Sequence, residues 1–282
     1  MPVVIVGDGA VGKGLAVALA LSGESVFLAG PGGTQRRTVL LSAEGSFRGR
    51  ADVETGVVSE APSGSVMICA LKAYSIAGAS AGMRAASPRC VISVSNGLGL
   101  WDERNSLHPE PAVLTAGFLL SGYTVRISPG AIYSVNDGEA GLLFQKSPIP
   151  VIPVKDMTPV VNAKWIVNSI VNPLGALTGL PNDQLLSAGL KPVVDTLFDE
   201  LSGLVPEDSH EQARQMLAGL LANSGNLCSM LQDLREGNPT ELPWLTGRVE
   251  KGLPGGCPTA RVICALVRAK AEASSCWPNP TR

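Results

Sequence analysis

The 282-residue sequence is poor in charged side chains, which make up 16% of the chain, and its net charge is only −2. Proteins that bind nucleic acid or anionic membranes usually carry a strongly basic surface, so the near-neutral balance gives no reason to expect either partner. The low charged share indicates instead extensive packing or an oligomer such as a homodimer, and the hydrophobic share of 45% allows a sizeable core.

Metal ligands are also scarce. The chain has two histidines and six cysteines, and no two cysteines form a Cys-x-x-Cys pair. Zinc sites and disulfide frameworks depend on such clusters and spacings. We therefore expect no metal site, and free, buried thiols of the kind found in a reducing cytoplasm.

Long apolar runs are missing as well. No stretch reaches the roughly 18 apolar residues of a membrane span. The N-terminus, MPVVIVGDG, lacks the basic region that opens a signal peptide. These features predict a cytoplasmic protein without membrane contact.

What the first half does contain is an alternation of short β-branched runs with helical patterns, which is typical of βαβ units in a mostly parallel sheet. Between residues 113 and 144, short runs broken by Gly, Pro and Asn-Asp-Gly predict antiparallel strands that finish this sheet. The expected strands are Val3–Val6, Ser25–Leu28, Val66–Leu71 and Cys90–Ser95, with a helix at Gly12–Ser22.

The second half has helical periodicity. A proline-rich stretch at residues 147–159 predicts a strand, a linker and a domain boundary. Apolar residues then recur at helical spacing in Asn162–Leu177, Leu186–Gly203 and Glu207–Arg235. The fold class expected is α/β, with a Rossmann-type parallel-sheet domain at residues 1–157 and an all-α domain at 158–282.

A glycine motif directly follows the first expected strand and opens the first helix. It reads Gly7-x-Gly9-Ala10-Val11-Gly12. In this context the glycines allow a tight turn, close approach of a pyrophosphate and close helix–strand packing, while the helix N-terminus offers free N–H groups. The motif predicts dinucleotide binding by these residues; the alternative is a merely structural turn.

The choice of dinucleotide depends on the region after the second strand. An acid for the ribose hydroxyls of NAD is expected there, and the sequence VFLAGPGGTQRR has none. Arg36 and Arg37 could instead pair with the 2′-phosphate of NADP. We therefore expect NADP(H), with NAD(H) as the alternative if the two arginines are simply solvated loop charges.

Two further polar points follow strands of the expected sheet, where ligands of open parallel sheets bind. Lys72 comes after Val66–Leu71 and is a candidate for contact with the cofactor or an anionic substrate. Asn96-Gly97-x-Gly99 follows the next strand, and its glycines permit close backbone approach. The alternatives are a surface lysine and an ordinary Asn-Gly turn.

The helix in NAKWIVNSIVNPLG carries Lys164, Asn168 and Asn172 at steps of four, so they share nearly one face and could line the wall of a cleft. A buried amide network is the alternative, and Pro173 is expected to bend the helix beyond the row. Ser229 and Glu241 are further polar candidates. Taken singly, each has a structural alternative: a serine within a helix that bonds to a preceding carbonyl, and an acid in the first turn of a short helix.

Taken together, these segments resemble the ketopantoate reductases (2-dehydropantoate 2-reductases) in order along almost the whole chain. The most specific likenesses are KWIVNSIVNPLGAL and SMLQDLREGNPTEL, beside the glycine motif, LKAY and NGLG. The resemblance implies that Lys164 is the general acid and that Asn168, Asn172 and Ser229 hold the substrate. It also implies that Asn96 lies between nicotinamide and substrate, and that Glu241 contacts the cofactor or orients the acid.

The sequence departs from this family pattern in several places. Pro31 stands where the family often has an arginine for the 2′-phosphate, and Thr246 stands where it has an asparagine. Pro243 falls in the same turn, and the connection RVEKGLPGGCP looks about one helical turn short.

The function expected is NADPH-dependent reduction of a small-molecule 2-keto acid, with ketopantoate as the first candidate. One alternative is a reductase of a different branched 2-keto acid on the same fold. The other is a non-catalytic NADP-binding regulatory protein, which would have no need to keep Lys164, Asn168, Asn172, Ser229 and Glu241 together.

Overall fold

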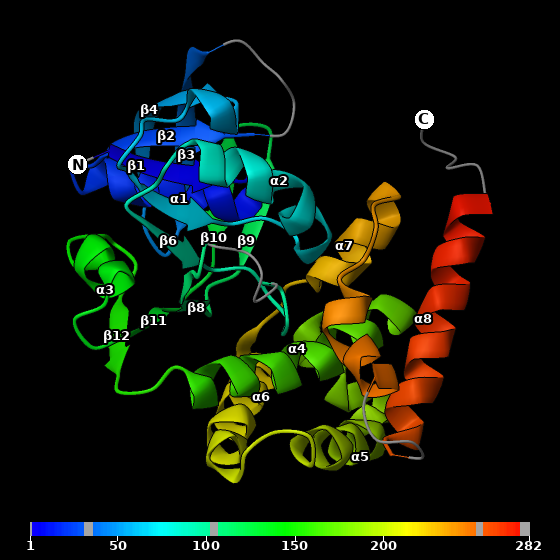
Figure 1. Ribbon diagram of the computed structural model, residues 1–282. Coiled ribbons are helices and arrows are strands. Elements are labelled where there is room, and N and C mark those ends of the chain that lie inside the picture. Colours follow the sequence, from blue (N-terminus) through cyan, green and yellow to red (C-terminus); the bar gives the residue numbers. More distant parts are fainter. Residues whose placement is uncertain (1, 31–35, 102–106, 252–255, 277–282) are drawn as a thin grey trace. The chain divides into compact units, whose positions relative to one another are not determined.

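A computed structural model describes residues 2–30, 36–101, 107–251 and 256–276 (Figure 1). The chain divides into two compact units: Met1–Ser95 with Leu100–Met157, and Asn96–Gly99 with Thr158–Arg282. The loop at 96–99 thus groups with the second unit, although it lies within the sequence of the first.

The first unit is built on a sheet whose strands follow the order β7-β6-β5-β1-β2-β4-β3-β10-β9. β1 pairs in parallel with β2 on one side and with β5 on the other, so the chain order reverses at β1. In open α/β sheets a ligand crevice forms at such a switch point, beyond the carboxyl ends of the strands. The strands are β1 (Pro2–Val6), β2 (Ser25–Ala29), β3 (Arg37–Gly45), β4 (Gly49–Gly56), β5 (Val66–Cys69), β6 (Cys90–Ser93), β7 (Glu110–Pro111), β9 (Phe118–Ser121) and β10 (Thr124–Ile127).

Helices cover both faces of this sheet, because alternate residues of a strand point to opposite sides. Val3 and Ile5 of β1 belong to the core that α1 (Ala10–Leu21) completes, whereas Val4 and Val6 pack in the core of α2 (Ala73–Ala85). This two-sided burial explains why β1 and β5 read as continuous apolar runs. The parallel Rossmann-type sheet expected from the sequence is confirmed.

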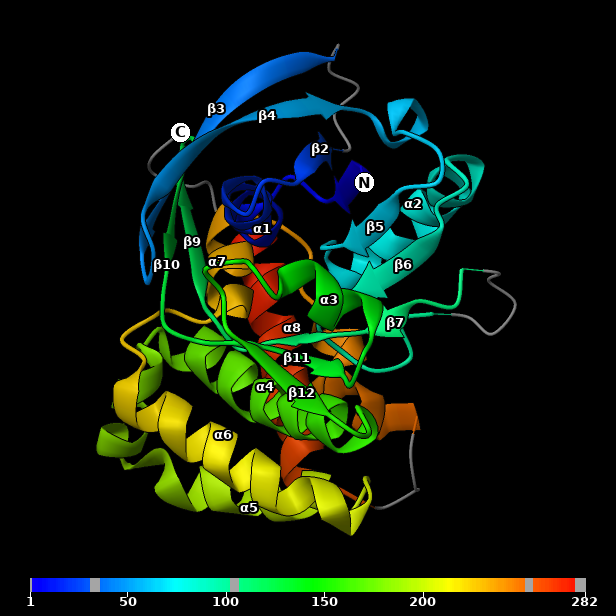
Figure 2. The ribbon, with the colours of Figure 1, turned by 90° about the vertical axis from the view of Figure 1, so that its left-hand side faces the viewer.

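The segment 113–144 differs from expectation. Only β9 and β10 join the large sheet, whereas β8 (Val113–Leu114), β11 (Ile132–Val135) and β12 (Val151–Val154) form a separate three-stranded sheet, and α3 (Glu139–Phe144) follows β11. The β3–β4 hairpin, prominent in Figure 2, was not expected either. Its strands interleave charged and apolar residues, since one face stays open, and a short turn, η1 (Val58–Glu60), follows β4.

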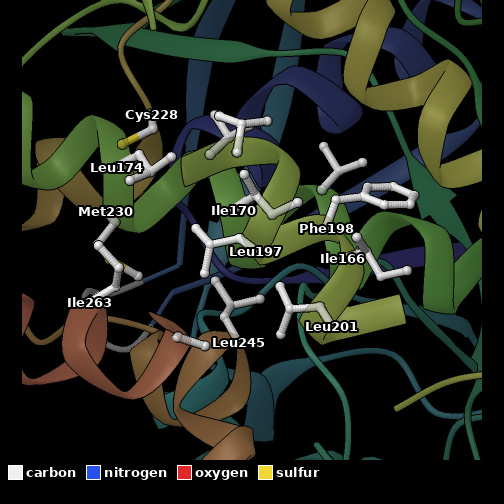
Figure 3. Packing of buried hydrophobic residues seen from close by; sticks show 14 of the residues in the cluster. Ile166, Ile170, Leu174, Leu197, Phe198, Leu201, Cys228, Met230, Leu245 and Ile263 are labelled. Atoms are coloured by element: carbon white, nitrogen blue, oxygen red, sulfur yellow. The ribbon is translucent and has the colours of Figure 1, made fainter. Parts of the chain in front are cut away.

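The second unit is helical, with α4 (Thr158–Thr178) in contact with α5 (Lys191–Ser202), α6 (His210–Asn223), α7 (Ser229–Glu236) and α8 (Pro258–Cys276). Ile166, Ile170 and Leu174 of α4 pack into the apolar core of this unit (Figure 3). Short helical turns connect the long helices: η2 (Asn182–Gln184), η3 (Leu186–Leu190), η4 (Glu207–Ser209), η5 (Leu242–Trp244) and η6 (Thr246–Lys251).

Two expected helices of this unit are broken. Glu207–Arg235 was expected to be one helix, but α6 and α7 are separated at residues 224–228. The backbone there bonds to η2 instead, with the N–H of Asp183 donating to the Ser224 carbonyl at 3.1 Å. Gly189, at φ +78°, lies within η3 and interrupts the second expected helix before α5 begins.

Candidate active site

The glycine loop of the first unit has the geometry of a phosphate cradle. Gly7 has φ +119°, and a Cβ there would lie 2.7 Å from the Ala70 carbonyl oxygen. At Gly9, by contrast, an added Cβ would meet no heavy atom within 4 Å, so the space above the loop is open. Gly9 also caps α1 without a side-chain hydrogen bond. Ala10 and Val11 therefore begin a helix whose N-terminus offers its N–H groups to an anion, and the residues fit a dinucleotide pyrophosphate.

Lys72 lies at the same edge of the sheet. It is the N-cap of α2 and follows β5, which pairs with β1. The hydroxyl of Ser95, after β6, donates to the Leu71 carbonyl at 2.8 Å and fixes the neighbouring strand end. Lys72 therefore lies where the sequence predicted it, after a parallel strand and at the edge of the sheet where ligands bind.

The two arginines expected at a 2′-phosphate have different surroundings. Arg36 forms a bidentate ion pair with Glu54 and lies over the Phe27 ring, 5.6 Å from its centroid. Hydrogen bonding to Arg36 lowers the pKa of the Glu54 carboxyl. Arg37 begins β3 with an exposed side chain. Pro31, the other residue in this expectation, lies outside the described residues.

The polar row on α4 is present in the second unit. Asn168 and Asn172 are 8% and 7% exposed, and Lys164 is half-buried. Burial lowers the pKa of Lys164 to about 8. Within the described part of the chain, Lys164 makes no hydrogen bond or ion pair.

The loop at 96–99 is anchored to this row and to the segment after it. The side-chain amide of Asn168 donates to the Asn96 side-chain oxygen at 3.1 Å. The N–H of Leu98 donates to the Trp244 carbonyl at 3.2 Å, and the Arg248 guanidinium donates to the Leu98 carbonyl at 2.8 Å. Asn96 and Asn168, which were expected at one site, are therefore brought together.

Ser229 is not in the interior of a helix, as the sequence suggested, but is the first residue of α7. Cys228, just before it, donates from its thiol to the Asn172 carbonyl at 3.2 Å. Gly175 makes room for this contact, since a Cβ there would lie 2.8 Å from the Cys228 sulfur. The start of α7, with the Ser229 hydroxyl, is thereby fixed to α4 next to Asn172.

Thr246 anchors a third segment. Pro173 has no N–H, so the carbonyl of Ser169, four residues earlier, lacks its usual helical donor. The Thr246 hydroxyl donates to that carbonyl at 2.7 Å, and both residues are fully buried. α4 continues across Pro173 to Thr178. Glu241, only 3% exposed, caps η5 immediately before this segment.

Cys228 and Thr246 are site-supporting residues that sequence reasoning missed. The cysteine was read as an ordinary buried thiol, and the threonine only as a departure from a family pattern. A signal existed for Thr246, because a proline inside a helix always leaves a carbonyl without its donor. The sequence does not say which distant residue supplies that donor.

The described residues contain no group of three or more His, Cys, Asp or Glu side chains that could hold a metal ion. Nor does any helix among them have the length and apolar character needed to cross a membrane. The RVEKGLPGGCP connection includes residues 252–255, which lie outside the described part.

Two family models match most of the chain. One is described as "Ketopantoate reductase PanE/ApbA" and matches residues 3–140; the other, "Ketopantoate reductase PanE/ApbA C terminal", matches residues 156–271. The chain belongs to the ketopantoate reductase family. The resemblance seen in the sequence is thereby confirmed, and the two-part fold agrees with it.

Individual relatives are more distant. A 2-dehydropantoate 2-reductase of Vibrio cholerae is 29% identical over 102 residues, so the chain matches about a third of that curated relative's length, 34% of each protein. The crystal structure of a PanE/ApbA family ketopantoate reductase from Ralstonia eutropha JMP134 is 26% identical, with 98% of this chain and 100% of that chain covered and a TM-score of 0.78. A D-mandelate dehydrogenase with NADH and anilino(oxo)acetate shares the fold at 19% identity, with 98% and 100% covered and a TM-score of 0.77.

Proposed function

We propose that the chain is a nicotinamide-dependent reductase of a 2-keto acid, with 2-dehydropantoate (ketopantoate) as substrate and Lys164 as general acid. The observation that carries the proposal is the α4 row, in which a half-buried lysine without a partner in the described residues precedes two nearly buried amides. In the same proposal, residues 1–157 bind the dinucleotide and residues 158–282 hold the keto acid.

The cofactor residues are the glycine loop, Lys72 and the arginines. When bound, a reduced nicotinamide supplies a hydride to the carbonyl carbon of the substrate. Gly9 gives the pyrophosphate access to the backbone, Gly7 and Gly12 allow the close packing of the turn that a Cβ would block, and the first turn of α1 donates N–H groups to the pyrophosphate. The sequence expectation for the dinucleotide is NADP(H), for which Arg37 has an exposed guanidinium, and the proposed reductase stands equally with NAD(H) as the alternative.

Lys164 has a physical reason to serve as the acid. Negative charge develops on the carbonyl oxygen as the carbon accepts hydride, and a nearby ammonium stabilises that charge and then donates its proton. With a pKa of about 8, the ammonium is still mostly protonated at neutral pH and gives up its proton more readily than an exposed lysine. The products would be the 2-hydroxy acid, the oxidised nicotinamide and a neutral lysine, which solvent reprotonates.

The amides and the start of α7 are suited to positioning the substrate. Asn168 and Asn172 supply directional hydrogen bonds without adding net charge. The Ser229 hydroxyl and the first N–H groups of α7 are suited to a carboxylate, because a helix N-terminus favours negative charge. Asn96, which is hydrogen-bonded to Asn168, adds a third amide to Asn168 and Asn172. Glu241 is assigned to orient the acid or to contact the cofactor.

A second candidate is the reduction of a different 2-keto acid. Two observations favour it: the fold is shared with a D-mandelate dehydrogenase, and Thr246 replaces an asparagine of the family pattern next to the row. Both candidates use Lys164 as the acid and the glycine loop for the cofactor. They differ in the side chain of the keto acid that the site must accommodate.

The test is oxidation of NADPH and of NADH by the purified protein with ketopantoate and with branched and aryl 2-keto acids. Turnover with ketopantoate at a kcat/KM above those of the other acids is expected. A higher kcat/KM with another acid would select the second candidate. Dinucleotide binding without oxidation by any keto acid would contradict both and favour a non-catalytic role.

A further inference from the structure

The end of β2 lacks a side chain to read the adenosine ribose. In Rossmann-type domains, an acid about 20 residues after the glycine loop, or an arginine near it, makes this contact. Here β2 ends at Ala29 and is followed by Gly30. A Cβ on Gly30 would lie 2.6 Å from a carboxylate oxygen of Asp8, so the Asp8 carboxylate takes the place of a side chain at this position.

Asp8 is available to a ligand. It is the exposed residue between Gly7 and Gly9, and its carboxylate has no hydrogen bond or ion pair within the described residues. The ammonium of Lys13 donates to the backbone carbonyl of Asp8, not to the carboxylate. Two free carboxylate oxygens at the end of β2 are suitable acceptors for vicinal hydroxyls.

A second carboxylate lies at the neighbouring strand end. Gly30 donates its N–H to the Gly56 carbonyl, at the end of β4. A Cβ on Gly56 would lie 2.5 Å from a Glu60 carboxylate oxygen, which also accepts the Val57 N–H at 3.1 Å. The ends of β2 and β4 therefore each have a glycine beside a carboxylate. The negative charge of these carboxylates disfavours binding of a dianionic phosphate there.

The arginines do not cancel this charge. Glu54 neutralises Arg36 in the bidentate pair, so the opposing cations that remain are Arg37 on β3 and Lys13, whose ammonium is held at the Asp8 backbone carbonyl. Residues 31–35, Pro-Gly-Gly-Thr-Gln, contain no ionisable side chain, so they add no charge of either sign.

We infer that Asp8 sets the cofactor preference: its carboxylate accepts hydrogen bonds from the ribose hydroxyls of NAD(H) and repels the 2′-phosphate of NADP(H). This reverses the preference expected from Arg36 and Arg37 in the sequence. The inference rests on the proposed dinucleotide binding by the glycine loop. The carboxylate that contacts the ribose thus comes from the loop after β1. At the end of β2, where this carboxylate is usually found, the chain has Gly30.

The test is a fluorescence titration of NADH and NADPH binding, which needs no turnover. The wild-type protein should bind NADH about tenfold or more tightly than NADPH, as expected from one like-charge contact. Asp8→Asn and Asp8→Ser should each lower the ratio Kd(NADPH)/Kd(NADH) by about tenfold, by weakening NADH and strengthening NADPH. Asp52→Asn, the same change at an exposed site in the middle of β4, should leave the ratio unchanged.

A second variant tests the arginine part. Glu54→Gln removes the partner of Arg36 and should strengthen NADPH binding without altering that of NADH. Tighter binding of NADPH by the wild type, with an unchanged ratio in both Asp8 variants, would overturn the inference and leave the proposed reductase standing. Failure of both dinucleotides to bind would overturn the proposed function together with the inference.

Discussion

The glycine loop of the first unit and the α4 face of the second differ in how they are built. The loop is contiguous, from Gly7 to Gly12, and its proposed contacts with the pyrophosphate are made by backbone N–H groups next to glycines. The α4 face collects side chains from the loop at 96–99, the start of α7 and the segment 241–246. Three contacts join these segments to residues 168, 169 and 172 of α4.

The difference shows where specificity for chemistry can arise. A backbone cradle recognises a phosphate group that many ligands share, so it says little about the reaction. On the α4 face, a cation and several amides are held in place by tertiary contacts with other segments. Each of these contacts involves a residue outside α4, so it can change while the sequence of α4 stays the same. Substitutions in the two regions should therefore separate cofactor binding from turnover.

The largest effect is expected at Lys164. Lys164→Ala removes the proton donor, so kcat should fall by a factor on the order of 10² to 10⁴, while the Kd of the dinucleotide stays within about twofold. Steady-state turnover and fluorescence titration measure the two quantities. Lys155→Ala, at an exposed lysine after β12, is the matched control and should leave both unchanged. A parallel loss of cofactor binding in Lys164→Ala would break the separation of the two regions.

The next effect concerns Gly9, where the loop is open. Its φ of −75° suits any residue and an added Cβ meets nothing, so Gly9→Val should lower the melting temperature by no more than about 5 °C, the cost of a poorer N-cap for α1. The new side chain occupies the space of the pyrophosphate, and the Kd of the dinucleotide should rise about tenfold or more. Gly78→Val, at an equally open glycine of α2, is the control. Unchanged dinucleotide affinity in Gly9→Val would mean that this loop does not hold the cofactor.

A smaller effect is expected at Thr246, which acts through α4. Thr246→Val leaves the buried Ser169 carbonyl without a donor and should lower the free energy of unfolding by about 1–3 kcal/mol. If Thr246 also positions the row, KM for the keto acid should rise more than kcat falls. Thr246→Ser, which keeps the hydroxyl, should restore both. Equal KM values in wild type and Thr246→Val would limit Thr246 to a structural role.

Much of the fold could be predicted because its signals are local. The β1–α1–β2 unit and the row on α4 each lie within a single stretch of sequence with a clear period. The break between α6 and α7 could not be predicted, because the apolar period of Glu207–Arg235 continues and the competing hydrogen bonds come from η2. The place of Asp8 beside Gly30 depends on the contact of two loops and has no sequence period at all.

The pH dependence of kcat/KM for keto-acid reduction tests the central claim most directly, because it reports the titration of the free enzyme. Burial holds the pKa of Lys164 at about 8, and the ammonium is the active form. The proton is lost as pH rises, so kcat/KM should be constant near neutrality and fall about tenfold per pH unit above that pKa. A profile that stays flat to about pH 10, near the pKa of an ordinary lysine, would contradict Lys164 as the acid.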